Sequence, residues 1–187
     1  MEEKIDECEV EKRKLSLVVS GSGLPAHQNN EDCTKIVETL IRNKLSYSLG
    51  TASLVSAYRI GVKPVSQRED KRSIVAKFSS EEIVQEVVKA SRTTRPQGLF
   101  FSENLIPKRQ AIMKVLRKAK QDHSDKISGC SSIRGGVYVW IKPPRPDNPG
   151  ARNSRLPVNT FSQLKNFCDS ILSVEVSELV ENWPSSF

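Results

Sequence analysis

The stretch KRSIVAKFSSEE, residues 71–82, contains a strand that runs directly into a helix. β-Branched and aromatic side chains recur through residues 72–78, which is typical of a strand. The two serines that follow can cap a helix, and the two glutamates lie in its first turn, where the helix dipole favours negative charge. The apolar face of this helix is made of Ile83, Val84, Val87 and Val88. The stretch therefore predicts a strand–helix unit at the centre of a domain.

Two strands and a helix precede this unit, and one strand follows it. Residues 15–21, LSLVVSG, and residues 54–61 are apolar runs bounded by turn residues, and 99–101 is a short fourth run. Between the first two, a helix of about four turns is predicted by the spacing of Cys33, Ile36, Val37, Leu40, Ile41 and Leu45. The order β-α-β-β-α-β over residues 14–104 predicts an α+β domain of the ferredoxin type, comparable to the RNA recognition motif.

Residues 105–172 predict a second, small domain with the order α-β-β-α. Pro107 suits the first turn of a helix, and a Gly-Gly pair separates two strand-like segments in the manner of a hairpin. The predicted elements are a helix over 107–121, strands at 131–134 and 137–142, and a short helix over 160–172. The intervening segment 143–157 holds five of the ten prolines and is expected to be irregular.

The two ends of the chain differ from both domains. Residues 1–13 place Ile5 and Cys8 near coiled-coil core positions, so they form either the end of a coiled coil (a stub) or a disordered acidic leader. Residues 173–187 are an acidic tail. The sequence contains neither an apolar run of transmembrane length nor the pattern of a secretory signal peptide. Four widely spaced cysteines fit a reducing compartment.

Positive charge is concentrated in one third of the chain. The whole chain carries +7 at pH 7, whereas residues 104–165 alone carry 13 basic and three acidic side chains. This asymmetry indicates a polyanionic partner, either nucleic acid or an acidic membrane surface. Within it, residues 107–121 hold six cations and no anion, although solvated helix faces usually mix both signs. We therefore predict that this helix binds phosphates.

The sequence offers little for catalysis. His27 and His123 lack partners at metal-ligand spacing, and neither a nucleophile elbow nor a zinc-protease motif occurs. The segment Gly21-Ser22-Gly23 is not followed by the lysine of a phosphate-binding loop and is expected to be a plain turn. Cys33 is expected to be a buried structural thiol. We therefore expect a protein that is not an enzyme and that uses neither a cofactor nor a metal.

Base stacking is not predicted for the first domain. The RNA recognition motif stacks bases on aromatic residues of its two central strands, but the corresponding positions here hold Val18, Ser73 and Val75. Phosphate contacts would have to replace stacking. In the second domain, Tyr138 and Trp140 are two residues apart and share one face of a strand. That face either stacks on bases or packs on the helix 107–121, and both alternatives suit the sequence equally.

The candidate nucleic-acid-binding residues are cations of both domains together with this aromatic pair. They are Arg59, Lys71, Arg72, Lys108, Arg109, Lys114, Arg117, Lys118, Arg134, Tyr138, Trp140 and Lys142. The first three would line a cleft between the two domains. Further positive charge follows the hairpin at Arg145, Arg152 and Arg155.

Several segments carry a resemblance to a known family: KRKLSLVVSGSGLP, SLVSAYRIG, KRSIVAKFSSEE, LFFSENLIPKRQAIMKVLRKAK, RGGVYVWIKP and NTFSQLKNF. In these patterns of apolar and basic residues, which extend over residues 10–172, the chain resembles the RNA-binding first-open-reading-frame protein of LINE-type non-LTR retrotransposons. The baculovirus few-polyhedra proteins share this layout. The resemblance implies a coiled-coil end, a degenerate recognition motif and a basic C-terminal domain.

The resemblance also implies a function. Members of this family bind single-stranded nucleic acid without catalysis, form trimers through the coiled coil, coat the RNA of the element and act as nucleic-acid chaperones. By position, it implicates Arg59, the pair Lys71 and Arg72, and four cations of the helix 107–121, namely Lys108, Arg109, Arg117 and Lys118. Only the end of a coiled coil is present, so homo-oligomer formation is expected of a longer parent chain.

Two functions of different classes follow. The first is binding of single-stranded RNA, or of single-stranded DNA, in a basic cleft of a cytoplasmic ribonucleoprotein, with nuclear entry left open and no membrane involved. The alternative is an interaction or structural module of a virus or a cell, whose basic face meets an acidic protein or an anionic membrane. Salt-sensitive binding that ignores sequence would distinguish the first from the second.

Overall fold

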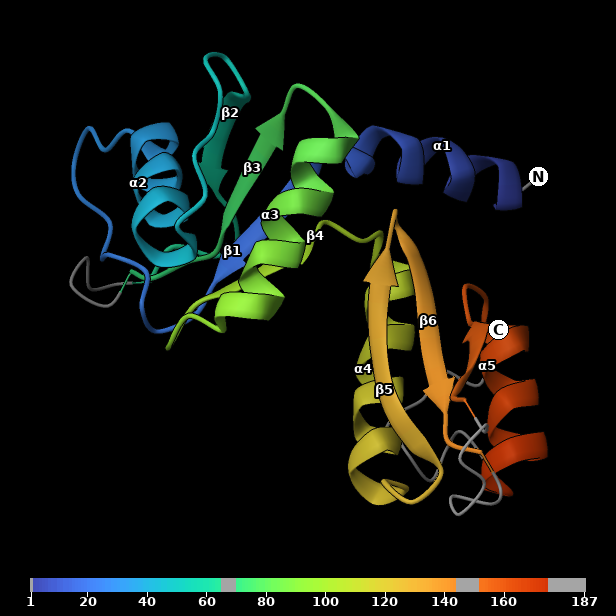
Figure 1. The fold of residues 1–187 in the computed structure, drawn as a ribbon. Helices are drawn as coiled ribbons and strands as arrows, with labels where there is room; N and C mark the ends of the chain where they lie inside the picture. The colour runs from blue at the N-terminus through green and yellow to red at the C-terminus, as the bar shows by residue number, and fades with distance from the viewer. Residues whose placement is uncertain (1, 65–69, 144–151, 175–187) are drawn as a thin grey trace. The chain divides into compact units, whose positions relative to one another are not determined.

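The computed structural model describes residues 2–64, 70–143 and 152–174 and has the predicted α+β class. The chain divides into two compact units, Met1–Asn104 and Leu105–Phe187. Each unit contains one antiparallel sheet with helices packed on it (Figure 1). The two units are described separately below.

Unit 1 contains a four-stranded antiparallel sheet with the strand order β2-β3-β1-β4. Helices follow the first and third strands of this sheet in the chain. The elements are α1 (Glu2–Lys14), β1 (Ser16–Ser20), α2 (Cys33–Leu45), β2 (Leu54–Arg59), β3 (Ile74–Phe78), α3 (Glu81–Thr94) and β4 (Phe100–Glu103). Each predicted strand and helix of this unit is present, with ends shifted by a few residues.

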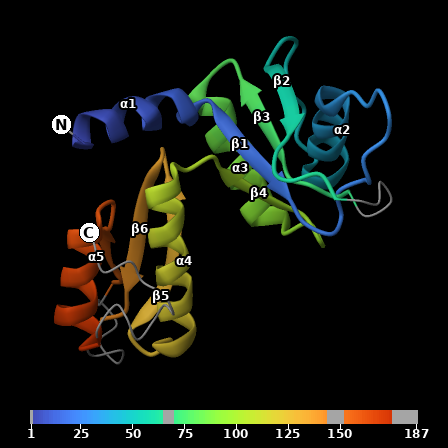
Figure 2. The ribbon, with the colours of Figure 1, turned by 180° about the vertical axis from the view of Figure 1, so that it is seen from behind.

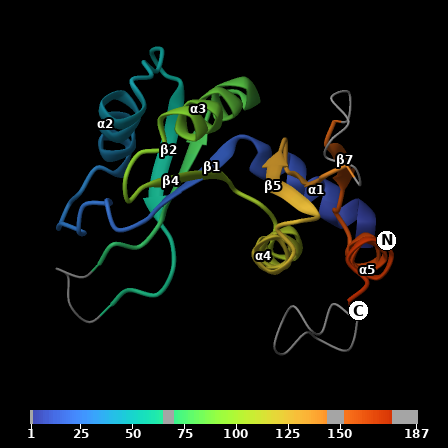
Figure 3. The ribbon, with the colours of Figure 1, turned by 60° about the horizontal axis from the view of Figure 1, so that its bottom comes forward.

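One face of this sheet forms the core of unit 1. Leu17 and Val19 of β1 and Phe78 of β3 are completely buried there, because alternate strand residues point to the same side. They pack with the apolar stripes of α2 and α3, whose buried residues include Val37, Ile41, Val84 and Val87. The two helices also pack beside each other (Figure 3). Figure 2 shows the opposite face of the sheet, with β1 in front of α3.

Side chains cap helices α2 and α3 of unit 1. The Asp32 carboxylate accepts hydrogen bonds from the backbone N–H groups of Thr34 and Lys35 at 3.0 and 3.2 Å. The Ser80 hydroxyl accepts one from Ile83 at 3.5 Å. These bonds satisfy donors that have no partner inside the helix.

Replacing Asp32 with alanine is expected to lower the free energy of unfolding by about 1 kcal/mol, because two helix N–H groups lose their acceptor. Urea denaturation followed by circular dichroism measures this loss. Asp32→Asn keeps a side-chain acceptor and should retain most of the stability. Equal losses in both variants would show that the negative charge matters and the cap does not.

Helix α1 lies at the N-terminal end of unit 1. Residues 2–14 form a helix, so the disordered-leader alternative is not the one observed. Cys8 is exposed on this helix. Association of several copies through α1 stays a prediction.

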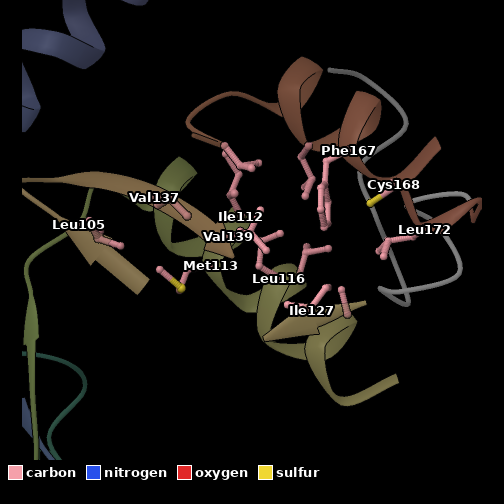
Figure 4. Close-up of a cluster of buried hydrophobic side chains, with 14 residues drawn as sticks. Leu105, Ile112, Met113, Leu116, Ile127, Val137, Val139, Phe167, Cys168 and Leu172 are labelled. Carbon is pink, nitrogen blue, oxygen red and sulfur yellow. The ribbon is translucent and has the colours of Figure 1, made fainter. Parts of the chain in front are cut away.

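Unit 2 contains a three-stranded antiparallel sheet with the strand order β5-β6-β7. Its elements are α4 (Pro107–Asp122), β5 (Ile127–Ile133), β6 (Gly136–Ile141), β7 (Ser154–Pro157), α5 (Phe161–Phe167) and the π-helical turn η2 (Cys168–Leu172). Figure 4 shows the core, where Ile112 and Leu116 of α4 meet Val139 of β6 and Phe167 of α5. Lys126 donates hydrogen bonds to the carbonyls of Ile171 and Leu172 at the end of η2.

The structure corrects two predictions for unit 2. The first strand, predicted at 131–134, begins four residues earlier, at Ile127 of β5. Residues 154–157 were expected to be irregular, but they form β7 and pair with β6, so the order is α-β-β-β-α. Proline is tolerated in β7 because this is an edge strand, where an N–H group facing outward needs no partner. Most of the other prolines of segment 143–157 lie outside the described residues.

Candidate nucleic-acid interface

The outer face of α4 carries a cluster of exposed cations. Lys114, Arg117 and Lys118 are exposed, while the residues between them at helical spacing are buried in the core. This arrangement follows from the 3.6-residue period, which places the apolar and cationic residues on opposite sides. Lys118 is 3.1 Å from Asp122 in an exposed i,i+4 ion pair, which contributes little stability and can be exchanged for a phosphate.

The first turn of α4 holds two cations that contact unit 2 itself. Arg109 donates a hydrogen bond to the carbonyl of Gly135 at 2.6 Å and so ties α4 to the β5–β6 turn. The Lys108 ammonium lies 5.9 Å from the centre of the Phe161 ring. Both side chains are half-buried. Structural contacts thus already occupy these two predicted site residues.

The structure decides which way the aromatic pair of β6 faces. Val137 and Val139 are completely buried in the core with α4, so Tyr138 and Trp140 lie on the opposite face of the strand. They therefore do not pack on α4. Both aromatic side chains are half-buried, and the Arg155 guanidinium lies 4.9 Å from the centre of the Tyr138 ring.

The basic helix and the aromatic pair are on different surfaces of unit 2. The cations of α4 point away from the core on the helix side, whereas Tyr138 and Trp140 point away from it on the sheet side. Arg134 is exposed at the β5–β6 turn, with φ of 51°, and Lys142 is exposed just after β6. A single surface does not unite all the candidates of this unit.

In unit 1, the three predicted cations bind neighbouring groups of their own unit. The Arg59 side chain is only 3% exposed and forms a bidentate pair with Glu31, at 2.6 and 3.0 Å. Arg72 pairs with the Asp70 carboxylate at 2.8 and 2.9 Å, and Lys71 donates to the carbonyl of Ser22 at 2.8 Å. Lys71 is exposed and Arg72 is half-buried. These placements argue against direct phosphate contact by Arg59.

Arg59 has a positioning role. Its remaining donors bond to the carbonyls of Pro25 at 2.9 Å and Arg72 at 3.0 Å, so one side chain joins β2 to two loops. The guanidinium lowers the pKa of Glu31 to about 2. The nearby guanidinium of Arg72 likewise lowers the pKa of Asp70 to about 2. Both carboxylates stay charged near neutral pH.

The polar cluster around Glu31 also contains a histidine and a cysteine. His27 Nδ1 lies 2.7 Å from the Glu31 carboxylate, and the Cys33 thiol lies 3.5 Å from it. Burial and the neighbouring Glu31 carboxylate raise the pKa of Cys33, which keeps its thiol protonated and unreactive near neutral pH. Among the described residues, no group of three His, Cys, Asp or Glu side chains could hold a metal ion.

The loop after β1 is a turn that packs on its own unit. Gly23 donates its N–H to the carbonyl of Gly98 at 2.8 Å, and Leu24 donates to Gly21 at 3.2 Å. These N–H groups are therefore not directed at a phosphate. The expectation of a plain turn is confirmed for this segment.

Two exposed aromatic residues of unit 1 are not among the predicted site residues. Tyr58 of β2 is 55% exposed and Phe100 of β4 is 65% exposed. The alternation within Leu99-Phe100-Phe101 could have indicated one of them, because Leu99 and Phe101 are buried and the residue between them must face outward. Arg155, which contacts Tyr138, was noted only as part of the basic run.

Comparison with known proteins gives no family for this chain. No protein-family model matches the sequence, and no curated protein sequence matches it. Within the described part of the chain, none of the helices is both long and apolar enough to span a membrane.

Proposed function

We propose that this protein binds single-stranded nucleic acid mainly through phosphate contacts made by the outer face of α4. RNA is the proposed ligand, and single-stranded DNA is the alternative. The observation that carries the proposal is the exposed triad Lys114, Arg117 and Lys118, set on a helix with no acidic residue before Asp122. The opposite side of this helix is anchored in the core by Ile112 and Leu116. A rigid row of cations of this kind suits a polyanion.

The architecture of unit 1 supports the same proposal. The chain order β1-α2-β2-β3-α3-β4 and the strand order β2-β3-β1-β4 support a ferredoxin-type arrangement comparable to the RNA recognition motif. Its two central strands lack the usual aromatic residues, in agreement with binding dominated by phosphates. We propose the role of a non-catalytic coat and chaperone protein of a retrotransposon-type ribonucleoprotein, with oligomer formation through α1 in a longer parent chain.

Replacing both Arg117 and Lys118 with alanine is expected to weaken binding of single-stranded RNA about tenfold, equally for all sequences. If each side chain contacts one phosphate, the slope of log K against log salt concentration should become shallower by about 1.4. Fluorescence anisotropy with a labelled RNA of about 30 nucleotides, between about 50 and about 200 mM salt, measures both effects.

A matched control removes two cations from another surface. Lys44 and Lys89 are exposed on α2 and α3, so Lys44→Ala with Lys89→Ala changes the net charge by the same amount. This control should bind nearly as the wild type does. If it loses as much affinity as the α4 variant, only overall charge matters. If the wild type does not bind at low salt, the cations of α4 serve an acidic protein or an anionic membrane.

A further inference from the structure

The sheet face of unit 1 opposite the helices carries an ordered set of side chains. Strand register places three rows across it: Ser56, Lys77 and Ser16; then Tyr58, Val75, Val18 and Ser102; then Ile60, Ser73, Ser20 and Phe100. The aromatic residues stand on the two edge strands, β2 and β4. The positions between them on the central strands hold only valine and serine.

This face is apolar and positively charged. Tyr58, Ile60 and Phe100 are among the large apolar side chains that the structure exposes, and Lys77 is exposed beside them. The described residues of these three rows include no carboxylate. Glu103 of β4 belongs to the other face, where it is buried and accepts a hydrogen bond from Gln85. Because a protein surface usually mixes charges of both signs, the face favours an anionic partner that also presents flat apolar groups.

Single-stranded RNA has both properties. Its bases offer a π-face to aromatic side chains, and its phosphates attract lysine. Tyr58 and Phe100 are separated by three strand spacings, or about 14 Å, a distance that about four stacked nucleotides can cross. The residues between the two rings on the central strands are short, and Val75 among them is only 5% exposed, so the two rings are the exposed parts of this surface.

We propose that Tyr58 and Phe100 are base-stacking residues for single-stranded RNA, with Lys77, in the row next to Tyr58, contacting the RNA backbone beside them. This inference rests on the proposed function and adds to it a second contact surface, on unit 1. In this proposal the stacking residues lie on the edge strands β2 and β4, whereas the RNA recognition motif carries its stacking residues on the two central strands. The α4 cations would then supply the salt-sensitive part of the affinity, and the two rings the part that salt affects little.

The test is the double variant Tyr58→Leu with Phe100→Leu, which keeps apolar side chains but removes the π-faces. Both side chains are more than half exposed, so the fold should tolerate the change. Base–aromatic stacking predicts a loss of RNA affinity of about tenfold or more, with the salt slope unchanged. In the complementary variant, Phe100→Tyr with Tyr58→Phe, affinity should stay within about twofold of the wild type.

The control variant is Val55→Ala with Val62→Ala, which removes exposed apolar side chains outside the three rows and should bind as the wild type does. Ultraviolet crosslinking of the full chain to RNA should identify Tyr58 and Phe100 as crosslinked residues. If the leucine variant binds as the wild type does while the α4 variant is weakened, the face has another partner, such as a protein, and the inference is wrong. If the wild type does not bind RNA at low salt, the proposed function fails as well.

Discussion

Replacement of Glu31 by glutamine is expected to lower the free energy of unfolding by about 3 kcal/mol at neutral pH. The Glu31 side chain is only 7% exposed and pairs with the Arg59 guanidinium, whose side chain is 3% exposed. Without the carboxylate, the guanidinium remains buried without its counter-charge, which is the costly way to break such a pair. Urea denaturation at pH 7 of the wild type and of Glu31→Gln measures the loss.

The stability difference between the wild type and Glu31→Gln should become smaller as the pH falls. The pKa of Glu31 is lowered to about 2 in the folded protein, mainly by the hydrogen bond from Arg59, and is about 4.3 in an unfolded chain. A depressed folded-state pKa gives stability that is present above pH of about 4.3 and is lost as pH falls towards 2. The difference between the wild type and Glu31→Gln should therefore shrink between about pH 5 and about pH 2.

The matched control for this prediction is Glu38→Gln. Glu38 pairs with Arg42 at 3.1 Å on the exposed side of α2, where the carboxyl side chain is 43% exposed. An exposed pair of this kind contributes about 0.3 to 0.5 kcal/mol. If Glu31→Gln were as mild as Glu38→Gln, or if its effect did not change with pH, the Arg59–Glu31 pair would not hold the loops of unit 1 together.

Replacement of Gly21 by alanine is expected to cost about 3 to 5 kcal/mol, because overpacking and backbone strain add together. A Cβ atom on Gly21 would lie 2.2 Å from the carbonyl oxygen of Gly98, and this oxygen already accepts the N–H of Gly23 at 2.8 Å. The φ angle of Gly21 is also +120°, which L-residues rarely adopt. Thermal unfolding followed by circular dichroism should show a large fall in Tm.

Gly61 separates the two causes of this effect. Its φ angle is +98°, but a Cβ atom there would meet nothing within 4 Å. Gly61→Ala therefore carries the backbone strain without the clash, and about 1 to 2 kcal/mol is expected. Equal losses at the two positions would mean that the packing of the turn after β1 against Gly98 contributes little.

The helices and most strands were predictable because their signals are local. The apolar spacing in α2 and α3, the caps at Asp32 and Ser80, and the proline in the first turn of α4 each act within a few residues of the chain. Strand β7 was missed because its main evidence is its pairing with β6, and a proline-rich segment gives no local sign of that partner.

The candidate site was predictable only in part, for the same reason. The cationic face of α4 follows from helical period alone, and the structure exposes Lys114, Arg117 and Lys118 as that period requires. Arg59 was misjudged, because its counter-charge Glu31 lies 28 residues earlier and the chain order does not show that the two meet. The orientation of Tyr138 and Trp140 was undecided until Val137 and Val139 were found in the core.

By itself, the sequence determined the α+β class, the concentration of positive charge in one third of the chain and the two-sided character of α4, since composition and periodicity are properties of the chain alone. Tertiary structure decided which cations are exposed and which are held in ion pairs. It also decided that Tyr58 and Phe100, 42 positions apart, share one sheet face, because β2 and β4 both join the same sheet through β3 and β1. The hydrophobic pattern of a strand fixes which of its residues face the core, but it does not show which strand lies beside it.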